Sequence, residues 1–218
     1  LVRDSRRLAL DSLGFTEGQL SDYKSAISRP YGMILISGPT GSGKSTTLYA
    51  TLELLNRDDN NILTIEDPVE YTVAGVNQVQ LKEEIGLTFP VALRSFLRQD
   101  PDIIMLGEIR DEDTAEMAVR SSLTGHLVLS TLHTNSAWGC VARMIDMGVH
   151  PYMLSETLAA CVAQRLVRRL CPYCKKEDTS KKIHAGIITG TARTYSRCGC
   201  EKCYYTGYSG RKAIYEVI

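Results

Sequence analysis

The sequence predicts an α/β fold, in which a mostly parallel β-sheet is flanked by helices and followed by a small cysteine-rich lobe. Short apolar segments alternate with stretches of helical character, and this alternation is typical of a parallel sheet covered on both faces. A glycine-rich turn follows the first strand-like segment, and five of the seven cysteines fall within the last fifty residues. Hydrophobic residues make up 44 % of the 218 residues, which indicates a sizeable core rather than disorder.

The predicted strands are short apolar runs, and the predicted helices have apolar residues at helical spacing. Residues 1–29 are expected to form a flanking pair of helices, interrupted by Gly14 and Gly18. Strands are predicted at 33–36, 62–65, 76–81, 103–106, 127–130 and 213–218. Helices are predicted at 45–55, 89–98, 111–122, 137–147 and 152–168. We therefore expect flanking helices at 1–29, an α/β core at 30–169, and a cysteine-rich module with a shortened final strand at 170–218.

A phosphate-binding pattern, G-x-x-x-x-G-K-[ST], lies between the first predicted strand and the next helix. It consists of Gly38, Pro39, Thr40, Gly41, Ser42, Gly43, Lys44 and Ser45. Glycines allow backbone N–H groups to turn toward phosphates, and a helix N-terminus adds a partial positive charge. We expect Lys44 to reach the β- and γ-phosphates of ATP, Ser45 to bind Mg²⁺, and Thr46 to lie near the α-phosphate. The alternative, a chance glycine-rich turn, does not account for the strand and helix on either side.

Acidic residues stand at the ends of two predicted strands, where open sheets bind their ligands. Glu108 follows the strand at 103–106 and is the candidate for polarising an attacking water. Gly107 stands where Asp commonly precedes such a Glu, so Mg²⁺ binding by that position is not expected. Glu66 follows another strand and could hold Mg²⁺ through water or assist as a base. The alternative is that both are solvated loop acids.

Two histidines flank the strand predicted at 127–130. His133 follows this strand, so the strand-end rule places it on the ligand side, where it could sense the γ-phosphate. His126 precedes the strand, and an ordinary structural role is the alternative for both histidines.

Three arginines, Arg94, Arg98 and Arg110, flank the segment that leads to Glu108. Arginine supplies the positive charge that phosphoryl transfer needs, and a neighbouring subunit often contributes it. Ordinary surface ion pairs with nearby acids are the alternative, and the sequence leaves both open.

Two C-x-x-C pairs, Cys171 with Cys174 and Cys200 with Cys203, predict a tetrahedral zinc site. Because a lobe of this size lacks a core of its own, metal binding would supply its folding energy. Cys198 lies two residues before Cys200 and could replace it, which leaves the third ligand open. A redox dithiol is the rival interpretation, but the sequence lacks a thioredoxin-like context.

Charge and hydropathy limit the classes of partner. Lys plus Arg and Asp plus Glu both number 25, whereas a nucleic-acid motor usually shows a basic excess. No apolar run approaches the ~20 residues that span a bilayer, so a membrane role is expected to be peripheral and through partners. Clustered cysteines with a nucleotide-binding motif indicate the cytosol. The chain starts at Leu1 without an initiator Met and is expected to be part of a longer protein.

Four ordered motifs resemble those of secretion ATPases, where they are called Walker A, Asp box, Walker B and His box. They lie at 38–46, at 64–70, at 97–102 with 107–111, and at 124–126 with 133–135. The cysteine pairs resemble those of assembly ATPases of type II secretion and type IV pilus systems, and retraction ATPases lack them. The family also has Gly before the Walker B Glu. The loop between the cysteine pairs, around 180–190, looks short by comparison.

The resemblance implies a RecA-like ATPase domain that binds ATP, Mg²⁺ and Zn²⁺ and forms a ring hexamer. Such a ring lies on the cytoplasmic face of the inner membrane and adds pilin-like subunits through an inner-membrane platform protein. Missing N-terminal domains would complete the nucleotide pocket and dock the ring to a membrane adaptor. By resemblance, Glu108 is the catalytic acid, Glu66 supports it or the metal, and His133 contacts the γ-phosphate region. The zinc ligands carried over are Cys171, Cys174, Cys200 and Cys203.

Three functions therefore compete. The first is a mechanochemical ATPase for assembly of a type II secretion pseudopilus, with type IV pilus assembly as its alternative. The second is a nucleic-acid translocase on the same fold, which the charge balance disfavours. The third is a nucleotide-gated module that does not hydrolyse ATP, because an isolated domain would lack arginines from other domains or subunits.

Overall fold

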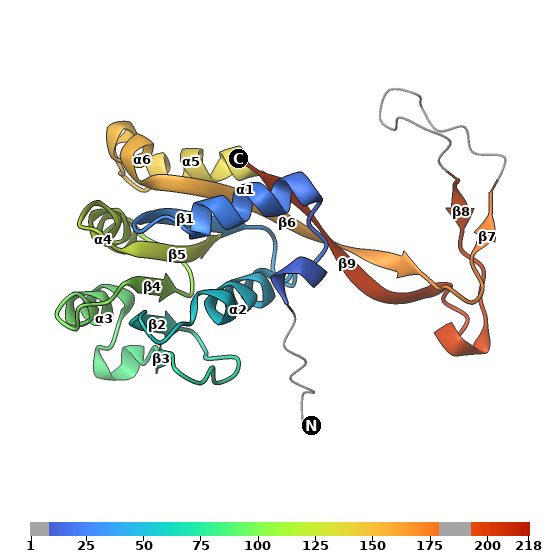
Figure 1. The fold of residues 1–218 in the computed structure, drawn as a ribbon, viewed down its shortest axis with the longest axis horizontal. Coiled ribbons are helices and arrows are strands. Elements are labelled where there is room, and N and C mark those ends of the chain that lie inside the picture. The colour runs from blue at the N-terminus through green and yellow to red at the C-terminus, as the bar shows by residue number, and fades with distance from the viewer. Residues whose placement is uncertain (1–8, 179–192) are drawn as a thin grey trace. The chain divides into compact units, whose positions relative to one another are not determined.

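A seven-stranded sheet forms the centre of the computed structural model, which describes residues 9–178 and 193–218 (Figure 1). Its strands are β1 Gly32–Ser37, β2 Ile62–Glu66, β3 Asn77–Gln80, β4 Ile103–Leu106, β5 Leu127–Leu132, β6 Leu158–Leu170 and β9 Tyr208–Val217. The spatial order is β3-β2-β4-β5-β1-β6-β9, and the five pairings from β3 to β6 are parallel. Cys161 and Ile218 exchange two backbone hydrogen bonds (2.9 and 3.0 Å), which identifies β9 as antiparallel to β6. The mostly parallel α/β fold predicted from sequence is confirmed.

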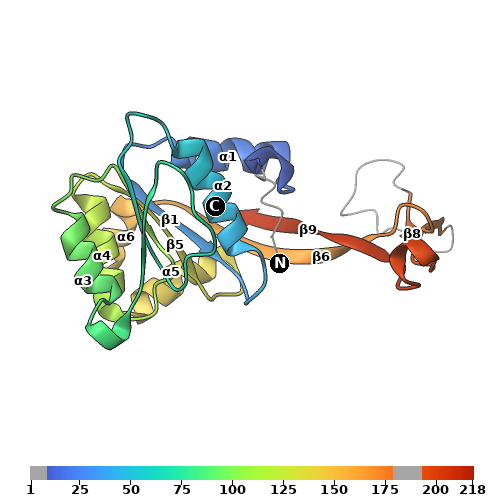
Figure 2. The ribbon, with the colours of Figure 1, turned by 90° about the horizontal axis from the view of Figure 1, so that it is seen from below.

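Helices cover both faces of this sheet (Figure 2). The helices are α1 Glu17–Ile27, α2 Lys44–Leu55, α3 Phe89–Phe96, α4 Glu112–Leu123, α5 Ala137–Asp146 and α6 Pro151–Thr157, with short 3-10 turns η1 Leu10–Ser12, η2 Glu83–Ile85 and η3 Glu201–Cys203. One buried cluster joins η1, α1 and α2 to one face, and another joins α3 to α6 to the opposite face. Since β1, β2, β4 and β5 are buried along their whole length, their continuous apolar runs are explained.

One predicted helix is wrong. Residues 152–168 were expected to be helical, but α6 ends at Thr157 and β6 continues from Leu158 to Leu170. An unbroken apolar run fits a buried strand as well as a buried helix. The segment forms a strand because it pairs with the edge of β1 that β5 leaves open, from Met33 to Ser37. Cys161, within the segment predicted to be helical, is buried on this strand.

Within residues 9–29, the described part of the region expected to form a flanking pair of helices, there is one α-helix. The turn η1 and helix α1 occupy this region, and Thr16 caps α1 by accepting a hydrogen bond from the Gln19 N–H. The part of the prediction that falls on residues 1–8 lies outside the described residues, as does the loop around 180–190. No helix among the described residues is long and apolar enough to span a bilayer.

The chain divides into two compact units, Leu1–Arg165 with Ala213–Ile218, and Leu166–Lys212. The last residues, Ala213–Ile218, belong to the large unit and include the end of β9. The small unit contains a two-stranded antiparallel pair, β7 Lys176–Glu177 with β8 Tyr195–Ser196. The final strand begins at Tyr208, earlier than predicted.

Helix α1 is tied to α2 by a buried hydrogen bond, in which Tyr23 Oη lies 2.8 Å from Thr51 Oγ1. Thr51 already donates its own proton to the Thr47 carbonyl, so Tyr23 is the donor. We expect Tyr23→Phe to lower the free energy of unfolding by about 1 kcal/mol in a urea titration. Tyr31→Phe is the control, because Tyr31 is 54 % exposed. Equal losses in the two variants would contradict this role of the Tyr23 hydroxyl.

Candidate nucleotide and metal sites

The loop after β1 bends closely around the start of α2. Gly43 caps this helix with a φ of 91°, a backbone conformation that favours glycine. At Gly38 a Cβ atom would lie 2.5 Å from the Gln164 carbonyl oxygen and 2.6 Å from Ser42 Oγ, so no other residue fits. Ser42 Oγ is buried and has no hydrogen-bond partner among the described residues. The loop is therefore a glycine-dependent cradle at a helix N-terminus, which fits a phosphate group.

Lys44 folds back over this cradle. Its Nζ donates hydrogen bonds to the carbonyl oxygens of Gly38 (2.9 Å) and Pro39 (3.3 Å). Burial lowers the pKa of Lys44, the charge of Glu108 opposes this, and the charge of Arg165 adds to it. Ser45 and Thr46 follow in the first turn of α2 and are exposed. A polyphosphate would replace the weak carbonyl partners of Lys44 with charged ones.

Glu108 lies just after β4, and the side chains of Arg110 and His133 lie next to its carboxylate. Arg110 donates to Glu108 Oε1 (2.5 Å) and also to Asp67 Oδ2 (3.2 Å). His133 Nε2 lies 3.4 Å from Glu108 Oε2. The Arg110 hydrogen bond lowers the pKa of Glu108, burial opposes this, and the charges of Arg110, His133 and Lys44 lower it further. The arrangement presents an ionised carboxylate at the edge of the phosphate cradle.

Gly107 lies close to β2, which favours a residue without a side chain. A Cβ at this position would lie 3.3 Å from Glu66 Cα and 3.4 Å from the Ile65 carbonyl oxygen. The Gly107 N–H donates to that carbonyl (2.8 Å), and the Gly107 carbonyl accepts from Thr131 Oγ1 (2.8 Å). Packing against the neighbouring strand explains why Gly, rather than the Asp common elsewhere, precedes Glu108.

Glu66 is placed differently from Glu108. Its side chain is buried, and its carboxylate accepts hydrogen bonds from Thr64 Oγ1 (2.6 Å), Gln78 Nε2 (3.1 Å) and the Tyr49 hydroxyl. Burial and the contact with Glu66 raise the pKa of Tyr49, so this phenol remains a donor. The carboxylate of Glu66 is thus engaged by three neutral donors, whereas Glu108 faces the phosphate loop.

The remaining predicted side chains lie at opposite edges of the sheet. His133 and Arg110 lie at the carboxyl edge with Glu108. His126 precedes β5, where its Nδ1 lies 2.9 Å from the Ser121 carbonyl oxygen. Arg94 lies on α3 and Arg98 lies just after it, and both side chains are exposed. The loop that follows lies at the amino edge of the sheet, because Asn61, the residue before β2, donates a hydrogen bond to the Gln99 carbonyl in it. Within this chain they are therefore distant from Glu108.

Sequence reasoning missed two residues at the carboxyl edge, Gln164 and Arg165. Gln164 is buried and bridges Thr47 Oγ1 (2.8 Å) and the Ser42 carbonyl (2.9 Å). Arg165 donates to the carbonyl and side-chain oxygens of Asn135 (2.9 and 3.2 Å). Both were hidden by the incorrect helix at 152–168. The available signal was a polar pair directly after an apolar run of strand length.

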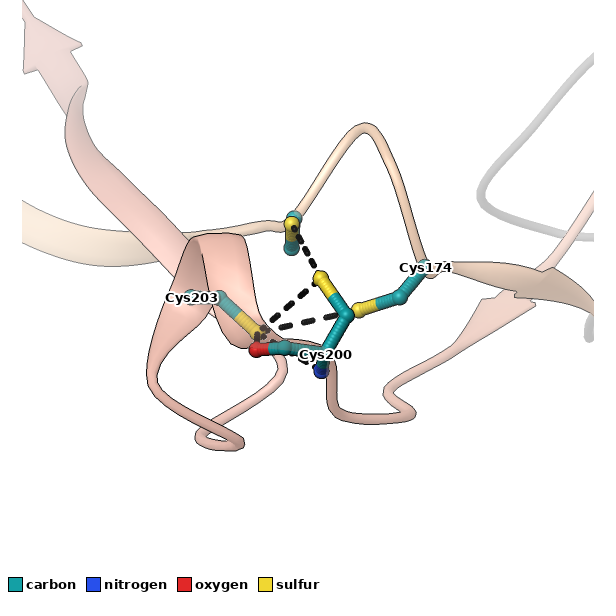
Figure 3. Close-up of side chains that lie close together, drawn as sticks. Cys174, Cys200 and Cys203 are labelled. Carbon is teal, nitrogen blue, oxygen red and sulfur yellow. Dashed lines mark hydrogen bonds between the residues drawn. The ribbon is translucent and has the colours of Figure 1, made fainter.

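The four predicted cysteine ligands converge in the small unit. Figure 3 shows the side chains of Cys174, Cys200 and Cys203 close together. The sulfur atoms of Cys171, Cys174, Cys200 and Cys203 lie within 4.8 Å of one another. The Sγ–Sγ distances are 4.0 Å for Cys171–Cys200 and 3.8 Å for both Cys174–Cys203 and Cys200–Cys203. Tetrahedral zinc with Zn–S bonds of ~2.3 Å requires sulfurs about 3.8 Å apart, so the geometry fits Zn²⁺.

The cluster decides between the two candidates for the third ligand, since it includes Cys200 and not Cys198. Backbone N–H groups of Cys200 and Gly207 lie 3.3 Å from Cys203 Sγ, which suits a thiolate. At Gly207 a Cβ would lie 2.3 Å from the Cys198 carbonyl oxygen. Cys198 therefore contributes its backbone to this turn.

Comparison with known proteins places these features in a family. A profile of the type II/IV secretion system protein family matches residues 1–218. The chain is 55 % identical over 225 residues to the type IV pilus assembly ATPase PilB of Myxococcus xanthus, covering 100 % of the chain and 40 % of that protein. It is 51 % identical over 223 residues to type II secretion system protein E of Klebsiella pneumoniae, covering 100 % and 44 %. The chain thus spans less than half the length of these curated relatives.

Solved structures agree with this family. The pilus retraction motor PilT with bound ADP matches with a TM-score of 0.67 and 38 % identity, over 74 % of the chain and 49 % of PilT. The VirB11 ATPase of the Brucella suis type IV secretion system matches with a TM-score of 0.56 and 25 % identity, over 88 % and 56 %.

The cysteine geometry predicts one Zn²⁺ per chain, bound through Cys200. We expect Cys200→Ser to lose the metal and to unfold the small unit, because a site of three thiolates holds zinc less tightly. Cys198→Ser is the matched control and should keep the metal. Metal content by atomic emission, with released thiols counted by a chromogenic reagent, checks both variants. Loss of zinc from Cys198→Ser but not from Cys200→Ser would reverse the assignment.

Proposed function

Because the chain belongs to the type II/IV secretion system protein family, we propose that it binds ATP at residues 38–46 and hydrolyses it to power assembly of a type II secretion pseudopilus. The observation that carries hydrolysis is the Glu108 carboxylate, kept ionised by Arg110 beside the Lys44 ammonium. Type IV pilus assembly is the second candidate, supported by the identity to a relative that is named a pilus assembly ATPase. Both candidates use the same chemistry.

In the proposed reaction, water attacks the γ-phosphorus of ATP, the bond to the β-bridging oxygen breaks, and ADP and phosphate are formed. Glu108 orients the water and accepts its proton, since it is the ionised carboxylate at this edge. Lys44 leaves its loop carbonyls to bind the β- and γ-phosphates. His133 is 3.4 Å from Glu108 and half-exposed, which suits a contact with both the carboxylate and the γ-phosphate.

The metal ions have separate roles in this proposal. Mg²⁺ would neutralise charge on the phosphates, and the exposed Ser45 hydroxyl at the start of α2 is the group that would hold it. Zn²⁺ would be held by Cys171, Cys174, Cys200 and Cys203 and would stabilise the small unit. Glu66 fixes Tyr49 and Gln78 behind the cradle, and this favours Glu108 over Glu66 as the base.

Assembly and location are also proposed. A homo-hexamer would bring Arg94 and Arg98 of one chain to the nucleotide of a neighbour, which their exposure permits. The ring would lie at the cytoplasmic face of the inner membrane, attached through a platform protein and an adaptor. The support for a role in such a system is that relatives are named a type IV pilus assembly ATPase and a type II secretion system protein. A nucleotide-gated module without turnover remains the alternative for the chain in isolation.

Removal of the proposed base gives the first test. We expect Glu108→Gln to slow steady-state ATP hydrolysis by about 10²-fold or more, because the amide cannot accept the proton. Binding of a fluorescent ATP analogue should persist, since the cradle is unchanged. Glu116→Gln is the control, because Glu116 is exposed on α4 and pairs with Arg120. Hydrolysis by the Glu108→Gln variant at the wild-type rate would remove Glu108 from the chemistry.

The pH profile gives a second test. Arg110 lowers the pKa of Glu108, so the carboxylate stays charged to lower pH, and the stabilisation from this pair is lost as pH falls through that lowered pKa. We expect Arg110→Gln to raise the pKa of Glu108 and to move the acid limb of kcat/KM to higher pH. Arg120→Gln should leave the limb in place. An unshifted limb in Arg110→Gln would mean that Glu108 does not control it.

A further inference from the structure

The strand β6 brings a buried glutamine to the start of the phosphate loop. Ser37, the last residue of β1, is paired with Ala163 of β6. Gln164 therefore lies level with Gly38, the first residue of the loop. Its backbone carbonyl oxygen would be 2.5 Å from a Cβ at Gly38, so the loop begins in close contact with Gln164.

The carboxamide of Gln164 also holds the middle of the loop. Nε2 donates to the Ser42 carbonyl oxygen (2.9 Å), and Oε1 accepts from Thr47 Oγ1 on α2 (2.8 Å). The side chain is 2 % exposed and Thr47 is fully buried, so water does not compete for these bonds. An amide is suited to this position because it supplies a donor and an acceptor together.

The bond to Ser42 fixes the direction of the next N–H group. In a planar trans peptide the C=O of Ser42 and the N–H of Gly43 point in opposite directions. With the carbonyl held by Gln164, the Gly43 N–H must face away from Gln164. Gly43 is the cap of α2, where a free N–H contributes to the positive end of the helix.

We propose that Gln164 is a positioning residue of the nucleotide site, which holds the Ser42–Gly43 peptide so that the Gly43 N–H faces the phosphates. The inference rests on the proposed function, because the ligand is the polyphosphate of ATP or ADP. Gln164 acts through the loop and does not itself contact the reacting atoms. Its loss should therefore raise KM and Kd for nucleotide far more than it lowers kcat.

Gln19 provides a matched control elsewhere in the large unit. Its Nε2 also donates to a backbone carbonyl, that of Tyr215 (2.7 Å), and its Oε1 accepts from the Thr16 N–H (3.1 Å). Gln19→Met thus also removes one donated and one accepted hydrogen bond, from a residue that lies on α1, outside the phosphate loop. A general loss of stability would be shared by both variants, but a loss of nucleotide affinity would not.

The test is calorimetric titration of the folded protein with Mg²⁺–ADP, which needs no hydrolysis. We expect Gln164→Met to weaken binding about tenfold, and Gln19→Met to leave the Kd unchanged. Gln164→Glu keeps the length and the acceptor for Thr47 but loses the donor to Ser42, so it should weaken binding as much. It serves as the second variant if Gln164→Met does not fold.

Two outcomes would overturn the inference. Wild-type affinity in folded Gln164→Met or Gln164→Glu would show that the carboxamide does not position the loop. An equal loss of affinity in Gln19→Met would show a general effect of stability. Absence of Mg²⁺–ADP binding by the wild-type protein would instead contradict the proposed function, and with it the inference.

Discussion

The arrangement of the candidate site depends on the parallel pairing of β1 with both β5 and β6. Ser37, at the end of β1, is paired with Leu132 on one side and Ala163 on the other. The next residue of each strand, Gly38, His133 or Gln164, therefore emerges at the same level of the sheet. Parallel strands align their carboxyl ends, so the phosphate loop after β1 lies between the chain segments that follow Leu132 and Ala163. These segments can hold the loop in place or contact its ligand. The pairing of Ile65 with Leu106 brings Glu108 to the same edge.

The surroundings of each carboxylate at this edge are set by its close contacts. Lys44, Arg110 and His133 all lower the pKa of Glu108, and Arg110 also binds Asp67. Glu66 lies one strand away yet meets neutral donors. Two carboxylates that follow neighbouring strands are thus given different surroundings, one facing the cradle and one buried behind it. Such a difference in environment is how a site assigns distinct roles to chemically identical groups.

Local patterns in the sequence predicted what local geometry controls. The buried strands β1, β2, β4 and β5 follow from apolar runs along the chain, and the sequence placed them correctly. The cluster of Cys171, Cys174, Cys200 and Cys203 was likewise expected from the spacing of two C-x-x-C pairs, and its role as a metal site stays a prediction. Features that depend on distant partners were not predicted. The strand β6 exists because β1 offers it an edge, and the partners of Glu66 include Tyr49 and Gln78, which no spacing rule connects. The choice of Cys200 over Cys198 likewise follows from the turn that Gly207 permits.

Steady-state release of phosphate from Mg²⁺–ATP by the assembled homo-oligomer tests the central claim most directly. A carboxyl edge that combines a phosphate cradle, a cationic Lys44 and an ionised Glu108 should sustain turnover, and chelation of Mg²⁺ should stop it. Tight nucleotide binding without turnover, in the assembled homo-oligomer and with Mg²⁺ present, would contradict hydrolysis and identify the domain as a nucleotide-gated module.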